Sequence, residues 1–181
     1  MSNVLNYQGR LLNPLDLKDE DFQNLGMQLA ITLSRVQRFW GQCRENYTVG
    51  QHCLSMVQLF EGDLKKQRWA IGHEAYEGLT GMDVPSPIKH SPAYLPYKEA
   101  EDRALVQFAR LYDLTPPMPL EIKKADKALM VMEAEALMPF NHEVDWRLIS
   151  EPRGLLYKLG ASQEEIKRDF INKWQELFGR L

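Results

Sequence analysis

The hydrophobic positions along this chain recur with the spacing of α-helices. Between about residues 21 and 39 the apolar positions fall three or four residues apart, which predicts one long amphipathic helix: Phe22, Leu25, Leu29, Leu33 and Val36. Similar spacing predicts helices over about 63–77, 98–112 and 120–137. No segment alternates convincingly between apolar and polar residues, as a half-buried strand would. The pattern therefore favours helices throughout.

Two further helices are marked by their first residues. Thr48 and Gln51 have the spacing of a capping box, and so do Ser162 and Glu165. The apolar residues behind these starts share one side of each helix: Val49, His52, Cys53, Met56, Val57 and Phe60 in the first, and Ile166, Phe170, Trp174, Leu177 and Phe178 in the second. Together the elements predict an all-α fold of five to seven helices around one core, forming a single domain over residues 1–181.

The stretch 78–96 separates two of the predicted helices. It contains two glycines and four prolines, including Val84-Pro85-Ser86-Pro87, which predicts an ordered loop rather than a regular element. Loops of this length in a compact domain are usually functional or disordered. A second connection ends in Pro116, Pro117 and Pro119 before the helix over 120–137.

Composition narrows the possible partners. The net charge is −3, and no cluster of Lys and Arg stands apart from acidic neighbours. Binding a long nucleic acid needs a concentrated basic surface, so this partner is not expected, whereas a small anion needs only one or two basic groups. No apolar run approaches the roughly 18 residues that span a bilayer. The N-terminal residues lack a secretory signal pattern, and Cys43 and Cys53 fit no disulfide framework, so we expect a reduced, cytoplasmic protein without a membrane partner.

Four ionisable residues fall where apolar side chains are expected. His52 lies within the apolar face of its helix, His73 and Glu74 are adjacent behind Trp69 and Ala70, and Asp126 shares a line with Ile122, Leu129, Met130 and Glu133. Each alone is more often a hydrogen-bonded core residue. Burying all four is costly unless they pair or bind a metal. Two imidazoles and two carboxylates suit Mn, Fe, Co or Zn, with Mg possible.

Several motifs resemble those of HD-domain nucleotide phosphohydrolases in order and approximate spacing. They are Gln37-Arg-Phe-Trp-Gly-Gln42, Tyr47-Thr-Val-Gly-Gln-His52, Ala70-Ile-Gly-His-Glu-Ala-Tyr-Glu77, Thr80-Gly-Met-Asp-Val-Pro-Ser-Pro-Ile-Lys89 and Lys124-Ala-Asp126. The resemblance covers roughly residues 35–137 and is strongest to bacterial 5'-deoxynucleotidases and short phage HD hydrolases, including phage deoxyadenosine triphosphatases. The ordered set is specific, whereas each motif alone is weak.

The resemblance implies a role for each matched residue. It implies a compact helical bundle with one divalent metal ion, and it assigns the metal ligands to His52, His73, Glu74 and Asp126. Glu77 matches an acid near the attacking water or leaving group, and it would lie one turn after His73 on the predicted helix 63–77. Asp83 matches an acid that contacts the substrate sugar or assists proton transfer. Substrate contacts match Arg38, Phe39, Trp40 and Lys89, with Lys89 expected at a phosphate. Close relatives form dimers, so a homo-oligomer is expected.

Two positions depart from the family pattern. Glu74 stands where the family has Asp, and Met82 is an additional residue between Gly81 and Asp83. The leading hypothesis is a metal-dependent hydrolase that uses metal-activated water to cleave a 5'-phosphate ester or the triphosphate of a deoxynucleotide. The alternatives are a hydrolase of cyclic nucleotides or alarmones, and a degenerate HD domain that binds nucleotide without turnover.

Overall fold

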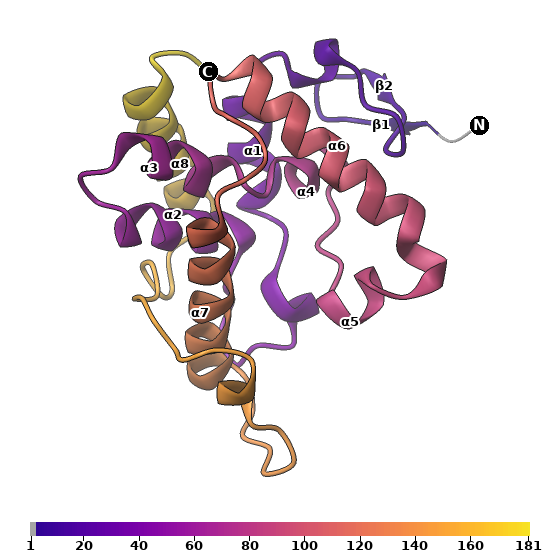
Figure 1. Ribbon diagram of the computed structural model, residues 1–181. Helices are drawn as coiled ribbons and strands as arrows, with labels where there is room; N and C mark the ends of the chain where they lie inside the picture. The colour runs from indigo at the N-terminus through magenta and orange to yellow at the C-terminus, as the bar shows by residue number, and fades with distance from the viewer. Residues whose placement is uncertain (1–2) are drawn as a thin grey trace.

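A computed structural model describes residues 3–181, and Met1 and Ser2 lie outside the described part (Figure 1). Seven of the described helices have six residues or more: α1 (Leu25–Leu33), α2 (Val49–Leu59), α3 (Leu64–Gly72), α4 (Ala75–Thr80), α6 (Leu95–Leu111), α7 (Leu120–Leu137) and α8 (Gln163–Phe178). The single turn α5 (Ser86–Lys89) and the short antiparallel strands β1 (Val4–Leu5) and β2 (Leu11–Leu12) complete the labelled elements. The all-α prediction is confirmed.

The core forms where α1 packs against α4 and α8, and where α2 packs against α3 and α7. The apolar face of α8 is directed inward as its spacing predicts, since Phe170 and Trp174 are fully buried. Phe108 of α6 packs beside this pair. At the end of α3, a Cβ on Gly72 would overlap the Phe108 ring, so this glycine allows α3 to approach α6 closely. That approach fixes where the chain leaves α3.

The two predicted capping boxes are confirmed. The Thr48 hydroxyl accepts a hydrogen bond from the Gln51 backbone N–H at 3.2 Å, and the Gln51 side chain accepts one from the Thr48 N–H at 3.0 Å. Ser162 and Glu165 make the same reciprocal pair at the start of α8. Helix α7 also has the predicted bounds of 120–137. Short-range signals therefore fixed the helices that carry His52 and Asp126.

The predicted single helix over 21–39 is wrong. Residues Asp19–Phe22 form a 3-10 turn, α1 ends at Leu33, and Phe39 and Trp40 follow with left-handed backbone angles (φ 50° and 55°) within the turn Arg38–Gly41. The backbone N–H of Arg38 donates to the Tyr47 carbonyl at 2.9 Å, a pairing that a continuing helix would prevent. The apolar spacing misled because Val36 packs on the core without being helical.

The predicted helix over 63–77 is also wrong, because the helix is interrupted between α3 and α4. The His73 ring donates from Nδ1 to the Ala70 carbonyl at 2.7 Å, and Glu74 has non-helical backbone angles (φ −99°, ψ 27°). The loop expected over 78–96 is shorter than predicted, since α4 continues to Thr80, α5 forms a turn, and a 3-10 turn (Pro92–Tyr94) leads into α6. Helix α6 begins at Leu95 because Pro96 is tolerated in a first turn.

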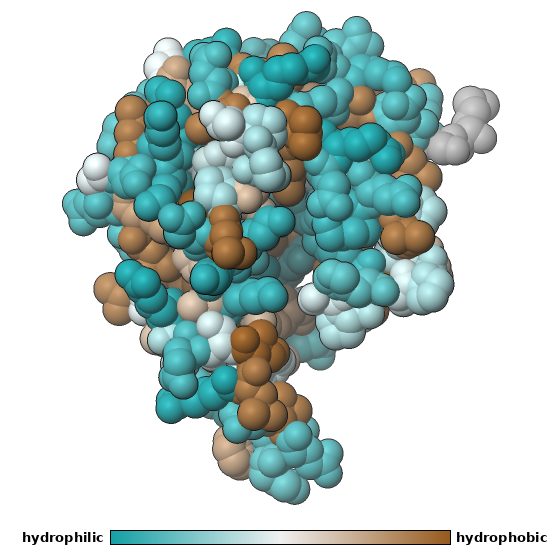
Figure 2. Space-filling view, in the orientation of Figure 1, coloured by the Kyte–Doolittle hydropathy of each residue, from teal (hydrophilic) through white to brown (hydrophobic). Residues whose placement is uncertain are grey.

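The segment between α7 and α8 projects from the helical body (Figure 1). It includes a 3-10 turn (Trp146–Leu148), and it exposes Phe140 and Leu148, each at 86%. Figure 2 shows hydrophobic surface gathered on this projection. Within residues 3–181, the helices are all too short or too polar to cross a bilayer.

Candidate metal centre

Four side chains from three parts of the fold meet at one point. His52 comes from α2, His73 and Glu74 come from the junction of α3 and α4, and Asp126 comes from α7. One ligand atom from each lies within 4.8 Å of the others. The predicted convergence is confirmed, and the group could hold a metal ion.

The orientation of the two imidazole rings fits a metal site. His52 donates from Nδ1 to Glu133 Oε1 at 2.7 Å, and the Nδ1 of His73 donates to a backbone carbonyl. The two Nε2 atoms then face each other at 3.2 Å. With both Nδ1 atoms donating, the two Nε2 atoms of neutral rings direct their lone pairs at one point, which is the arrangement that a bound cation needs. Ligand atoms about 2.0 to 2.1 Å from a tetrahedral ion lie about 3.3 Å apart, close to this separation.

The carboxylates complete the donor set. Asp126 Oδ1 lies 3.1 Å from His52 Nε2, and Glu74 Oε1 lies 3.5 Å from His73 Nε2. Glu74 leaves the backbone at the break between two helices rather than from a regular turn. The longer side chain is thereby accommodated, and its carboxylate stays within the group despite the departure from Asp.

Charges around His52 favour its protonated form. Burial lowers the pKa of His52, but the carboxylates of Glu133 and Asp126 outweigh burial and raise it to about 9. The pKa of Asp126 is lowered, because its loss of solvent is outweighed by the hydrogen bond and charge of His52. Without a metal ion, this raised pKa favours a proton on His52. Metal binding must displace that proton.

Predicted site residues from two distant segments lie together. Arg38 is only 8% exposed, and its Nη1 lies 3.8 Å from Asp83 Oδ2. The exposed Trp40 donates from Nε1 to the Asp83 carbonyl at 3.0 Å, while the half-buried Phe39 ring lies beneath the Arg38 guanidinium, 5.5 Å from it. The pKa of Asp83 is raised, because burial outweighs the opposing charge of Arg38. The turn at 38–41 and the loop after α4 thus form one surface.

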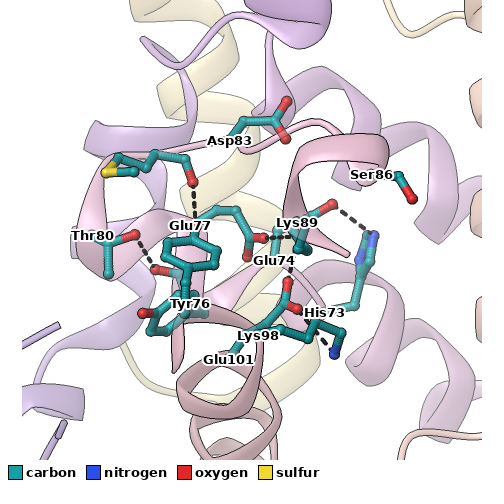
Figure 3. Close-up of polar contacts among 12 residues, drawn as sticks. His73, Glu74, Tyr76, Glu77, Thr80, Asp83, Ser86, Lys89, Lys98 and Glu101 are labelled. Carbon is teal, nitrogen blue, oxygen red and sulfur yellow. Dashed lines mark hydrogen bonds and ion pairs between the residues drawn. The ribbon is translucent and has the colours of Figure 1, made fainter. Parts of the chain in front are cut away.

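Glu77 lies in a charged cluster beside His73 and Glu74, two members of the four-residue group (Figure 3). Lys89 Nζ donates to Glu77 Oε1 at 2.9 Å and to Glu101 Oε1 at 2.5 Å. Glu77 and His73 occupy different helical segments, so the expected placement one turn apart on a continuous helix is wrong. Lys89, expected at a phosphate, is held between two carboxylates.

Burial sets the protonation of this cluster. Glu77 is 1% exposed, and its Oε2 has no hydrogen-bond partner among residues 3–181. Burial, with the charge of Glu74, raises the pKa of Glu77 well above its ordinary value against the attraction of Lys89. The pKa of Glu101 is lowered, since contacts with Glu77 and Lys89 outweigh its burial. Of the two acids, Glu77 is the one that retains a proton more readily.

Two acids were missed as site residues. Glu133 is fully buried, and besides His52 it accepts from Arg38 Nε at 3.1 Å. The sequence feature that pointed to Glu133 was its position on the apolar face of α7, two turns after Asp126. Glu101, on the inner face of α6, had only the weaker signal of an acid between Tyr97 and Ala104.

A pocket of about 410 Å³ opens beside the metal group. Its lining includes His73, Glu74 and Asp126 from the group and three lysines, Lys89, Lys98 and Lys123. A second pocket, of about 710 Å³, lies beyond Trp40 and Asp83. The first pocket therefore connects the four-residue group to a space lined by both lysines and acids.

Comparison with known proteins gives a partial likeness. No family model matches the chain. The chain is 31% identical over 110 residues to the uncharacterized protein YfdR of Escherichia coli (strain K12). The match covers 60% of this chain and 58% of that protein, so the chain spans less than two thirds of this relative's length.

Proposed function

We propose that this protein is a metal-dependent phosphohydrolase of the HD type that acts on nucleotides, cleaving a 5'-phosphate ester or the triphosphate of a deoxynucleotide. The observation that carries the proposal is the convergence of His52, His73, Glu74 and Asp126 with both Nε2 atoms directed at one point. These residues are separated by up to 74 positions in the sequence, and each falls in a motif of the resemblance.

The surroundings of the group support a phosphate as the reacting moiety. The chemistry that a divalent ion supplies at such a site is Lewis acidity toward water and a phosphoryl oxygen. Arg38 lies on the same side as Asp83, and its guanidinium suits the planar, bidentate recognition of phosphate oxygens. Lys123 adds positive charge to the adjoining pocket, and among residues 3–181 it has no ion pair, whereas Lys89 and Lys98 are paired with acids. Stabilising negative charge on equatorial oxygens is the main catalytic requirement of phosphoryl transfer.

Two buried acids have the properties needed to transfer the proton of the attacking water. The pKa values of Glu77 and Asp83 are both raised, chiefly by burial, and raised carboxyl pKa values are typical of groups that transfer protons. Glu77 has a free carboxyl oxygen, whereas Asp83 faces Arg38. We assign proton transfer to Glu77 first and to Asp83 second.

A substrate panel tests the proposal. Nucleoside mono-, di- and triphosphates, in ribo and deoxy forms, are each incubated with Mg, Mn, Co or Zn, and the products are separated by chromatography. Free phosphate from a monophosphate indicates a nucleotidase, and inorganic triphosphate indicates a triphosphohydrolase. The Asp126→Asn variant is the background control, because it removes a proposed ligand. If nucleotide binds but no product forms with any metal, the non-catalytic alternative replaces the proposal.

A further inference from the structure

One buried carboxylate connects the metal group to the arginine. Glu133 Oε1 accepts from His52 Nδ1 at 2.7 Å, while Glu133 Oε2 lies 3.1 Å from Arg38 Nε and 3.0 Å from Arg38 Nη2. The side chain is 0% exposed, so every contact it makes is within the protein. Each carboxylate oxygen therefore has a different task.

We propose that Glu133 is a positioning residue that couples two sites, fixing the metal-binding nitrogen of His52 and the anion-binding edge of Arg38 at the same time. The inference deepens the proposed function and rests on it for the roles of His52 and Arg38. Because the carboxylate accepts at Nδ1, the lone pair of the neutral His52 ring is confined to Nε2, which faces His73. Second-sphere acceptors of this kind orient metal-binding histidines.

The same contact decides which part of Arg38 is available. Glu133 Oε2 occupies the Nε and Nη2 side of the guanidinium, and Nη1 is left on the side of Asp83, 3.8 Å from its carboxylate. The Nη1 edge, on the side of Asp83, is therefore the edge that Glu133 leaves for an anion. The backbone supports this arrangement, since Phe39 and Trp40 adopt left-handed angles immediately after Arg38. Non-glycine residues in that region are strained, and such strain gathers at functional sites.

Stability alone does not account for Glu133. A buried ion pair often contributes no more than apolar residues of similar volume would, because desolvation offsets the attraction. A methionine or leucine in place of Glu133 could fill the same space beside the core. Holding two functional side chains in fixed orientations accounts for the buried charge of Glu133, whereas packing does not.

The test compares Glu133→Gln with Glu135→Gln, which changes an exposed glutamate of the same helix. Gln retains one acceptor oxygen but turns an amide NH2 toward His52 or Arg38, so one contact is lost. Co²⁺ affinity, measured by calorimetry without nucleotide, should fall by about 10- to 100-fold in Glu133→Gln, as for other second-sphere changes. The affinity of the metal-loaded protein for inorganic phosphate should fall as well. Glu135→Gln should match the wild type in both measurements.

A double variant separates the two contacts. In an Arg38→Ala background, Glu133→Gln should still weaken Co²⁺ binding but should cause little further loss of phosphate affinity, because the phosphate effect acts through Arg38. Unchanged Co²⁺ affinity in a folded Glu133→Gln protein would overturn the proposal. So would phosphate losses that simply add in the double variant.

A wild-type measurement guards against a variant that does not fold. The ¹⁵N and ¹H spectra of the His52 ring, assigned with His52→Gln, should show a strongly downfield Nδ1 proton both without metal and with Zn²⁺. A His52 ring protonated only at Nε2 in the metal-free protein would contradict the inference. No turnover enters these measurements, so an inactive protein that still gives these results overturns the phosphohydrolase proposal and leaves the positioning role in place.

Discussion

The Nε2 atoms of His52 and His73 face each other at 3.2 Å, although one residue belongs to α2 and the other lies at the end of α3. Each ring is held from behind by an acceptor on its Nδ1, Glu133 for His52 and the Ala70 carbonyl for His73. Neither ring can turn its lone pair away without breaking a buried hydrogen bond. A proton on His52 Nε2, which also lies 3.1 Å from Asp126 Oδ1, would occupy the place of a metal ion bound there, so the two would compete.

This competition predicts that metal binding releases a proton. The pKa of His52 is raised to about 9, since nearby carboxylates outweigh its burial, so the ring is protonated below that pH and must lose its proton to bind a metal ion. Close to one proton per ion should be released near pH 7, and metal affinity should rise about tenfold per pH unit up to about pH 9. Calorimetry in two buffers of different ionisation enthalpy measures this proton. Identical heats in the two buffers would contradict the prediction.

Removing one carboxylate of the group should abolish metal binding. Asp126→Asn keeps the size of the side chain but loses the charge that lies 3.1 Å from His52 Nε2. We expect no saturable Co²⁺ binding at concentrations that fill the wild-type site, and activity should be lost with it. Asp102→Asn, an exposed acid of the same pocket that lies outside the four-residue group, is the control and should bind normally. Equal Co²⁺ affinity in both variants would exclude Asp126 as a ligand.

The sequence predicted the parts of the fold that depend on short-range signals. Thr48 and Gln51 start α2 by satisfying each other's backbone groups, and that local pairing fixes the place of His52. The bounds of α7, and with them the position of Asp126, follow from a regular apolar face. Four inward ionisable residues then converged as the cost of burying them separately had indicated.

The parts that could not be predicted depend on contacts between distant residues. The helix after Asp63 stops at Gly72 because the His73 ring occupies the Ala70 carbonyl. The chain turns at Arg38 because its N–H pairs with the Tyr47 carbonyl. The partner of Arg38 is Glu133, 95 residues later, and no local pattern specifies that pairing.

Arg38→Ala should affect both binding and stability. Loss of a charge-assisted contact should weaken nucleotide binding by about 1 to 3 kcal/mol. The fully buried Glu133 also loses one of its two partners, so the free energy of unfolding should fall by about 3 to 5 kcal/mol, the range for breaking a buried pair. Nucleotide titration and urea denaturation measure the two effects. Arg153→Ala, which changes an exposed arginine outside both pockets, is the control. A wild-type dissociation constant in Arg38→Ala would remove Arg38 from the site.

Within the charged cluster of Glu77, Lys89 and Glu101, we expect Glu77→Gln to affect turnover and not stability. Glu77→Gln removes an acid whose pKa burial raises, yet Lys89 remains paired with Glu101 at 2.5 Å. Stability should change little, while turnover should fall by about 10²- to 10⁴-fold, the usual contribution of general acid–base catalysis. Co²⁺ and nucleotide binding should persist. Full activity in Glu77→Gln would make Asp83 the leading proton-transfer group.

Lys89→Met, in contrast to Glu77→Gln, should lower the stability of the protein. The change leaves Glu77 and Glu101 buried without the cation between them, so repulsion and desolvation should lower the free energy of unfolding by about 3 to 5 kcal/mol. Protonating Glu77 relieves that repulsion, and the loss of stability should therefore shrink as the pH falls. Urea denaturation at several pH values, with the exposed Lys65→Met as the control, measures this trend. A loss of nucleotide affinity in Lys89→Met without a loss of stability would instead indicate that Lys89 leaves its carboxylates to bind phosphate.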